Sequence, residues 1–503
     1  MGSLSPPKRV LLLTNSEHGQ ANVFLATSYA LLTLSDEDVE VHFASFSPIK
    51  SFVDQISSHA QRTNNLTALR SRSIIFHTIN GIDMVSAWSR PELDTERGRL
   101  KNHHLLDAIR RMAVLLKVTL PWTGDEFVQI MQSVIDIVHR VRPDVVAADP
   151  VFSPAVTALR YINAKFLILS PNTIKDFAMP FQPNGEALWK YPCTGTPHTY
   201  PLPPHLIPQN MFLILLSLLL AAAFDAHRGE IQSRVSQHYP GAILTTLSDL
   251  SLRPHVLKTK FLVANLSEIE FPLKVIPSHI IPCGPLLRPA IPIGEADPAL
   301  AEWLHRGPTV YINLGTHLYF NETFSAEMAK GVRILLDHQD MEKDKEMTSL
   351  LLLSDSDFQG PWMAVRKILG NEIYQEIVKI VEWIEAEPTA VLESGRVVCA
   401  VHHGGANSFM ETVSAGIPQV VLPLWMDTYD FARRAELLGI GRWGNQGHID
   451  QMCDGKQLGD VLIDVVVGGR WSVYAENAKK LADICHQAGG GRAVAGRFIL
   501  DQI

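Results

Sequence analysis

The stretch at 401–412, VHHGGANSFMET, places hydrogen-bond donors where a short apolar strand is expected to turn into a helix. The unpaired N–H groups and partial positive charge of a helix N-terminus suit a phosphate. Gly404 and Gly405 let the backbone come close to such a ligand, and His403 adds a side-chain donor. The stretch therefore predicts a diphosphate site. An ordinary turn that carries two incidental histidines is the alternative.

The helix that follows this turn adds groups suited to a nucleoside. Asn407 and Ser408 fall in its first turn and supply two more donors. Glu411 lies one turn further along, on the same face as Asn407. A carboxylate would repel a phosphate, but it accepts hydrogen bonds from the hydroxyls of a ribose. The pattern predicts a diphosphate site with a ribose contact beside it.

Apolar strands and amphipathic helices alternate on both sides of this stretch. The first half carries a strand at 9–14, a helix at 21–34 and a strand at 39–45, then a helix at 125–140 and strands at 144–148 and 165–169. The pattern restarts after 306 with five strand candidates, TVYINLG, LLLLS, IVKIVEW, VVCAV and VVLPL. It predicts two doubly wound α/β domains, whose ligands bind at the carboxyl ends of the strands.

Length, charge and cysteine content narrow the class of protein. A chain of 503 residues predicts two domains, and a net charge of -8 argues against nucleic acid as a partner. Five scattered cysteines without C-x-x-C spacing suggest neither a zinc site nor a disulfide framework, so we expect a cytoplasmic protein. The apolar run at 211–224 is too short to span a bilayer. We expect a buried helix capped by Asn210, with a weak membrane-surface contact as the alternative.

The segment 401–441, from VHHGGANSFMET through GIPQVVLPLWMDTYDF to GIG, resembles the nucleotide-sugar signature of the UDP-dependent glycosyltransferases, most closely those of fungi that act on small molecules. The resemblance implies a GT-B fold, in which two Rossmann-like domains face a cleft. We expect an acceptor domain at 1–285, a linker at 286–305 and a UDP-sugar domain at 306–475. The helices at 476–503 should return to the first domain.

The same resemblance implies roles for individual residues at the donor site. His403 would bind the β-phosphate, Asn407 and Ser408 the α-phosphate, and Glu411 the ribose, with Gly405 in the turn. Two further segments resemble the family. YINLGT implies that Gly315 and Thr316 face the phosphates, and VEWIEAEPTAVL implies that Trp383 stacks on uracil, with a core tryptophan as the alternative.

Two residues at the end of the signature concern the sugar. The resemblance implies that Asp427 holds sugar hydroxyls. Many relatives have a glutamine after this aspartate, and this chain has the shorter Thr428, which leaves the identity of the sugar open.

The family implies transfer of a sugar from a UDP-sugar to a hydroxyl, with inversion at the anomeric carbon and without a metal or other cofactor. The acceptor hydroxyl needs a base, usually a histidine oriented by a carboxylate. Asp149, in RPDVVAADPVF, resembles the strand-ending aspartate of the family, and a helix cap is its alternative role. Gln20 aligns with the usual histidine, so we expect His18, two residues earlier, to be the base, with a surface turn histidine as the alternative.

The sequence thus predicts an enzyme that transfers a sugar, with glucose expected, to a small lipophilic phenol, polyketide, terpenoid or sterol. We expect no obligate protein partner. A UDP-sugar epimerase and a non-catalytic nucleotide-sugar binding protein are the alternatives, and Gln20 favours the second. Asp355 and Asp357 have the spacing of a metal-binding D-x-D pair. We expect a polar turn there instead, because this pattern after a strand is more often a turn. His103 and His104 are expected on a surface helix.

Overall fold

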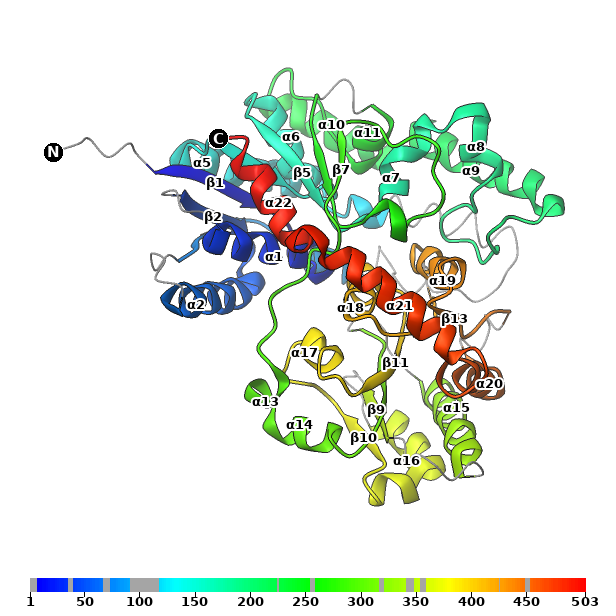
Figure 1. The fold of residues 1–503 in the computed structure, drawn as a ribbon. Helices are drawn as coiled ribbons and strands as arrows, with labels where there is room; N and C mark the ends of the chain where they lie inside the picture. The colour runs from blue at the N-terminus through cyan, green and yellow to red at the C-terminus, as the bar shows by residue number, and fades with distance from the viewer. Residues whose placement is uncertain are drawn as a thin grey trace.

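Two parallel sheets, one in each half of the chain, organise the protein in the computed structural model (Figure 1). The structure describes residues 7–503 except 35–38, 67–72, 91–116, 224–225, 254–257, 316–320, 341–347, 353–358, 425 and 448–452. Thr316, His103, His104, Asp355 and Asp357 therefore lie outside the described residues.

The first sheet has seven strands in the order β3-β2-β1-β4-β5-β6-β7, and its pairings are parallel. Its centre is apolar on both faces: Val10 to Leu13 have no exposed surface, because helices cover both sides. The strands are β1 (Lys8–Leu13), β2 (Val39–Ser45), β3 (Ile75–Thr78), β4 (Val145–Ala148), β5 (Phe166–Ser170), β6 (Phe261–Val263) and β7 (Ile280–Pro282).

Helices on both faces complete this N-terminal domain. The longer ones that cover the sheet are α1 (His18–Leu34), α2 (Lys50–Leu66), α5 (Gly124–Val141), α6 (Ser153–Tyr161) and α10 (Ala226–His238). Short helices lie in the connections between strands, among them α3 (Met84–Trp88), α7 (Ile174–Ala178), α8 (Glu186–Trp189) and α11 (Leu247–Leu252). The predicted strands and helices of this half that fall on described residues are present, and the helix expected at His103 and His104 lies outside them.

The second sheet has six strands in the order β10-β9-β8-β11-β12-β13, again parallel. They are β8 (Thr309–Asn313), β9 (Thr348–Leu352), β10 (Val378–Val381), β11 (Val397–His402), β12 (Gln419–Val421) and β13 (Gly441–Trp443). The helices between and after them are α15 (Glu322–Asp340), α16 (Gln359–Tyr374), α17 (Pro388–Leu392), α18 (Ala406–Ala415), α19 (Thr428–Leu437) and α20 (Gly455–Val466). The five predicted strands of this half are confirmed, and the doubly wound fold with them.

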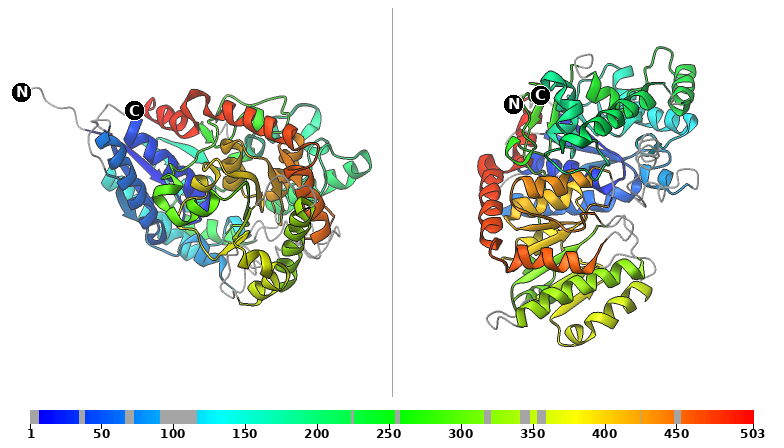
Figure 2. Two further views of the ribbon diagram at one scale, coloured as in Figure 1. Left: turned by 60° about the horizontal axis from the view of Figure 1, so that its bottom comes forward. Right: turned by 90° about the vertical axis from the view of Figure 1, so that its right-hand side faces the viewer.

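The chain crosses from one domain to the other twice. The first crossing is shorter than the predicted linker, because α13 (Ile293–Ala296) and α14 (Pro298–Leu304) pack into the core of the second domain. The second crossing lies between α21 (Trp471–His486), which packs on the second domain, and α22 (Gly491–Leu500), which packs on α1 (Figures 1 and 2). A Cβ atom on Gly491 would lie 2.3 Å from the carbonyl oxygen of Pro285, so the two crossings touch.

The apolar helix α9 (Ile207–Ala223) differs from its prediction. It is not buried: Phe212, Leu215, Leu218 and Leu219 are between 41% and 52% exposed. Asn210 lies inside the helix instead of capping it, and its side chain binds the backbone of α8 at Leu188 and of the loop after α8 at Tyr191 and Cys193. Within the described part of the chain, no helix is both long and apolar enough to cross a bilayer.

Candidate active site

The predicted phosphate turn connects β11 to α18, and its shape depends on two glycines. Gly405 precedes the helix with φ -65° and ψ 145°, and no described side chain caps the first turn. The ring of His403 lies between two backbones: a Cβ atom on Gly315 would be 2.7 Å from its Cε1, and one on Gly405 would be 2.5 Å from its Nε2. The helix N-terminus is thus open to an anion, with the imidazole held beside it.

His402 has a structural role. It is buried, its Nε2 lies 2.6 Å from Oε1 of Gln419, and its Nδ1 accepts from the N–H of Gly404 at 3.1 Å. Burial lowers the pKa of His402 to about 4, so the ring is neutral at pH 7. For His402 the alternative, a histidine that does not bind the phosphate, is therefore correct. Its neutral ring stabilises the turn that holds His403.

Side chains on α18 continue the predicted site. Nδ2 of Asn407 donates to the carbonyl oxygen of Gly19 at 3.4 Å and so joins α18 to the start of α1 in the other domain. Ser408 is half-buried in the same turn. Glu411 is half-buried and makes no hydrogen bond to any described residue, and burial raises its pKa to about 7. Its carboxyl group is available to a ligand, as the ribose contact requires.

Gly315 and Trp383 follow β8 and β10, two strands of the same sheet that have β9 between them. Gly315 follows β8 with φ +79°, a left-handed conformation that favours glycine. Trp383 comes two residues after β10, and its side chain is 65% exposed. The alternative of a core tryptophan is therefore wrong. A large exposed ring at the carboxyl edge of the sheet is available for stacking on a base.

Asp427 immediately precedes α19 and faces the cleft, where its side chain still reaches solvent. The surrounding protein, and then the nearby Asp176, raise the pKa of Asp427 to about 7. Thr428 is different: it is 1% exposed and packs beneath Gly404, where an added Cβ atom would be 2.7 Å from the Thr428 carbonyl oxygen. The expectation that Thr428 faces the sugar is therefore corrected, because a buried side chain offers a ligand no surface.

Both carboxylate oxygens of Asp149 accept hydrogen bonds from residues other than His18. Asp149 is fully buried, and its Oδ2 accepts from Thr14 Oγ1 at 3.0 Å and from Asn15 Nδ2 at 2.6 Å. Its Oδ1 accepts from the N–H of Val151 at 2.9 Å, and burial raises its pKa to about 7. Asp149 therefore anchors the loop between β1 and α1.

His18 begins α1, is exposed and meets the ring of Phe52 edge-on, with centroids 4.7 Å apart. Residues two apart on a helix point in nearly opposite directions, roughly 200° apart. The residue of α1 that turns to the cleft is accordingly Gln20, which lines a cavity of about 70 Å³ between the two domains. Asn172, Thr173 and Asp176 line the same cavity from the N-terminal domain, and Ala406, Asp427 and Asp430 from the C-terminal domain.

A buried ion network beside this cavity joins the domains, and sequence reasoning missed it. Arg434 of α19 binds Glu270 of the N-terminal domain at 2.5 Å. Asp430 pairs with Lys175 of α7, and also with Arg433 at 2.5 Å. The guanidinium of Arg433 continues to the carbonyl oxygens of Thr196 and His198. The sequence shows the charged residues of 430–436, DFARRAE. They did not predict a buried network, because charged runs of this kind most often lie on a helix face exposed to solvent.

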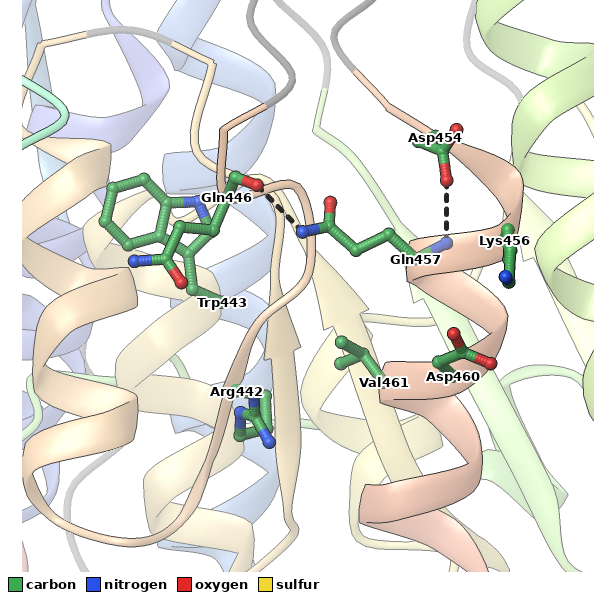
Figure 3. Close-up of a pocket in the computed structure, with 8 residues that line it drawn as sticks. All are labelled: Arg442, Trp443, Gln446, Asp454, Lys456, Gln457, Asp460 and Val461. Atoms are coloured by element: carbon green, nitrogen blue, oxygen red, sulfur yellow. Dashed lines mark hydrogen bonds between the residues drawn. The ribbon is translucent and has the colours of Figure 1, made fainter.

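A larger pocket, of about 440 Å³, opens at the outer edge of the second sheet between β13 and α20 (Figure 3). Arg442, Trp443 and Asp460 line it, and Nε2 of Gln457 donates to the carbonyl oxygen of Gln446 across it at 2.7 Å (Figure 3). No predicted site residue lines this pocket. Among the residues that the structure describes, no group of His, Cys, Asp and Glu side chains is arranged to hold a metal ion.

Comparison with known proteins agrees with this site. The model of the UDP-glucuronosyl and UDP-glucosyl transferase family matches residues 367–488, which contain the phosphate turn and α19. Glycosyltransferase sdnJ of Sordaria araneosa is 31% identical over 498 residues, 96% of this chain and 95% of that protein. UDP-glycosyltransferase stmC of Aspergillus ustus is 26% identical over 231 residues, 43% of this chain and 42% of that protein.

Solved structures share the fold at low sequence identity. The glycosyltransferase of kitacinnamycin superposes with a TM-score of 0.62 at 16% identity and covers 99% of this chain and 100% of that one. A UDP-glucosyltransferase from Polygonum tinctorium gives a TM-score of 0.62 at 15% identity and covers 99% of each chain. Both likenesses show the GT-B architecture. The full-length similarity to the Sordaria enzyme, together with the match to the family model, establishes that this chain belongs to the UDP-dependent glycosyltransferase family.

Proposed function

We propose that this enzyme transfers glucose from UDP-glucose to a hydroxyl group of a small lipophilic acceptor, with inversion at the anomeric carbon. The observation that carries the proposal is the uncapped start of α18, with His403 beside it and Glu411 one turn further along. The departing UDP carries the negative charge that develops in the reaction, and a preorganised helix N-terminus with side-chain donors stabilises such charge. Trp383 would stack on the uracil and Asp427 would hold the sugar hydroxyls.

The acceptor class is proposed from the relatives and from the first domain. The Polygonum tinctorium enzyme is described as capable of glucosylating indoxyl. A human relative, 26% identical over 43% of this chain and 34% of its own, is a 2-hydroxyacylsphingosine 1-beta-galactosyltransferase. Both acceptors are lipophilic. For this chain we propose a phenol, polyketide, terpenoid or sterol, bound by the N-terminal domain.

Incubation with UDP-glucose and a panel of phenols, followed by mass spectrometry, tests the proposal. We expect a glycoside and free UDP. An epimerised UDP-sugar would instead indicate an epimerase. Tight UDP binding without any product would indicate a non-catalytic binding protein, a function that Gln20 in the cleft favours.

Chelation tests the proposal that no metal takes part. If the helix N-terminus and His403 supply the positive charge, turnover in excess EDTA should equal turnover without it. A loss of turnover that manganese restores would contradict this part of the proposal.

A further inference from the structure

We propose that Asp176 of α7 is the general base that takes the proton of the acceptor hydroxyl, in place of the histidine that Gln20 replaces. This inference rests on the glycosyl transfer proposed above. It begins from the interdomain cavity, which is lined by Gln20 and Asp176 from the N-terminal domain and by Asp427 from the C-terminal domain. The amide of Gln20 cannot accept a proton at neutral pH, so the base must come from another side of this cavity.

Three other candidate groups are directed elsewhere or already accept hydrogen bonds from the protein. His18 is directed toward Phe52 and does not line the cavity. Asp149 has no exposed surface, and both of its oxygens accept hydrogen bonds from the surrounding loops. Asp430 lines the cavity, but its two oxygens bind Lys175 and Arg433.

The two carboxylate oxygens of Asp176 differ in their hydrogen bonds. Its Oδ2 accepts from the N–H of Thr173 at 2.9 Å and from the Thr173 hydroxyl at 3.0 Å, which caps α7. Its Oδ1 makes no hydrogen bond within the described part of the chain. The cap thus orients the carboxylate while it leaves the second oxygen for a substrate.

Charges from two elements act on this carboxylate. Burial raises the pKa of Asp176, and Asp430 of α19 raises it further. Lys175 of α7 and Arg434 of α19 act in the opposite direction, and the net shift is upward. A carboxylate whose pKa lies above its ordinary value is a stronger base toward the proton of a hydroxyl group.

Asp176 and Asp427 have different proposed roles because they belong to different domains. Asp427 stands at the start of α19 in the donor domain, where the sugar is expected, whereas Asp176 belongs to the acceptor domain. In the proposed step, Oδ1 of Asp176 accepts the hydroxyl proton as the acceptor oxygen forms a bond to the anomeric carbon. The bond from that carbon to the β-phosphate oxygen breaks, and its electron pair leaves with UDP. Asp176 then releases the proton to water.

Asp176→Asn tests this role, because it keeps the side-chain volume and one oxygen for the cap. With UDP-glucose and the phenol that gives most glycoside, we expect kcat to fall by ~10²- to 10⁴-fold, while the Kd for UDP stays within about twofold. Thr173→Ala is the matched control: it weakens the cap but keeps the carboxylate, so we expect less than a tenfold loss. His18→Ala should keep wild-type turnover.

Replacing the lost carboxylate of Asp176 by another base distinguishes a catalytic role of Asp176 from a structural one. Gln20→His in the Asp176→Asn background places an imidazole in the same cavity and should recover at least tenfold in kcat. Formate should likewise raise the turnover of Asp176→Ala, because this small carboxylate can occupy the space of the lost one. In the wild-type enzyme kcat should rise with pH to a plateau as Asp176 ionises, and in the Gln20→His double variant the midpoint should move to the histidine range, near pH 6.5.

Each other outcome overturns the assignment. Wild-type turnover in Asp176→Asn would show that Asp176 is not the base. A loss that neither Gln20→His nor formate recovers would show a structural role only. If the wild-type enzyme makes no glycoside from any acceptor, the proposed function fails, and this assignment fails with it.

Discussion

The ring of His403 lies between the backbones of Gly315 and Gly405, which fixes its direction before any ligand arrives. His403→Ala should therefore weaken UDP binding by ~1–3 kcal/mol, the range of a charge-assisted hydrogen bond. Glu411→Ala should weaken it by a similar amount through the lost ribose contact. Isothermal titration calorimetry measures both. Unchanged UDP affinity in the two variants would place the nucleotide elsewhere.

The raised pKa of Glu411, about 7, predicts a pH dependence of nucleoside binding. Uridine is the suitable ligand, since it contains the ribose but no titrating phosphate. Above pH 7 the carboxylate is ionised and accepts strongly from ribose hydroxyls. As the pH falls through 7 it gains a proton, and the loss of charge should cost about 1 kcal/mol, or about fivefold in Kd. Glu411→Gln should give a weaker Kd that does not change between pH 5.5 and 8.

Individual residues could be predicted only where the chain kept a family motif. The phosphate turn was predicted from donors and glycines that are contiguous in sequence. The residue of the β1–α1 loop that faces the cleft was not predicted, because both His18 and Gln20 are candidates in the sequence. Only the helix geometry shows that Gln20 faces the cavity. The partners of Asp149 could not be predicted either, since Thr14 and Asn15 are 135 and 134 residues away in the chain.

At the scale of elements, the junction of β11 and α18 depends on a glycine for space and not for backbone conformation. Gly405 has φ -65°, which any residue can adopt, but an added Cβ atom would be 2.5 Å from Nε2 of His403. Gly405→Ala should therefore displace the imidazole and weaken UDP binding at least tenfold. The fold should persist, as judged by circular dichroism.

Gly294→Ala is the control for this variant, because no heavy atom lies within 4 Å of the added Cβ and the backbone is not left-handed. It should bind UDP with wild-type affinity. If both alanine variants behave alike, the close contact with His403 has no role in nucleotide binding.

Long apolar strands were predictable because helices cover both faces of each sheet, which requires continuous apolar runs. The strands β6, β7 and β13 have three residues each and lie toward sheet edges, so they leave no such run. The burial of α9 was mispredicted for a related reason: an apolar composition does not reveal which faces of a helix meet another element. Its exposed face carries Phe212, Leu215 and Leu219.

At the scale of the whole molecule, the buried ion network on α19 holds the domains together. Removal of one member leaves its partners buried and uncompensated, which typically costs ~3–5 kcal/mol. Arg434→Met should therefore lower the free energy of unfolding by about that amount, since Glu270 loses its partner and Asp176 a favourable charge. Urea denaturation followed by circular dichroism measures the change.

Arg470→Met provides the comparison for Arg434→Met. Arg470 pairs with Asp464 at 2.7 Å, but its side chain is 60% exposed, so the loss should be below about 1 kcal/mol. Equal destabilisation by the two variants would mean that the network contributes no more than a surface pair. The network itself could not be predicted from sequence, because Lys175 and Asp430 are 255 residues apart.

The contact between the two interdomain crossings restricts how substrates reach the cleft. The cavity of about 70 Å³ between the domains is far smaller than the ~300–1,000 Å³ of an ordinary ligand site, so we expect the domains to separate when a nucleotide sugar and an acceptor bind. The crossings meet where Gly491 touches Gly284 and Pro285, and this point cannot move apart without breaking their packing. We therefore expect separation to be a rotation about this contact, which also parts the buried pairs of Arg434 with Glu270 and of Lys175 with Asp430. In such a rotation the shift of each atom grows with its distance from Gly491. The cleft therefore opens most at the rim that is most distant from Gly491, and we expect both substrates to enter there.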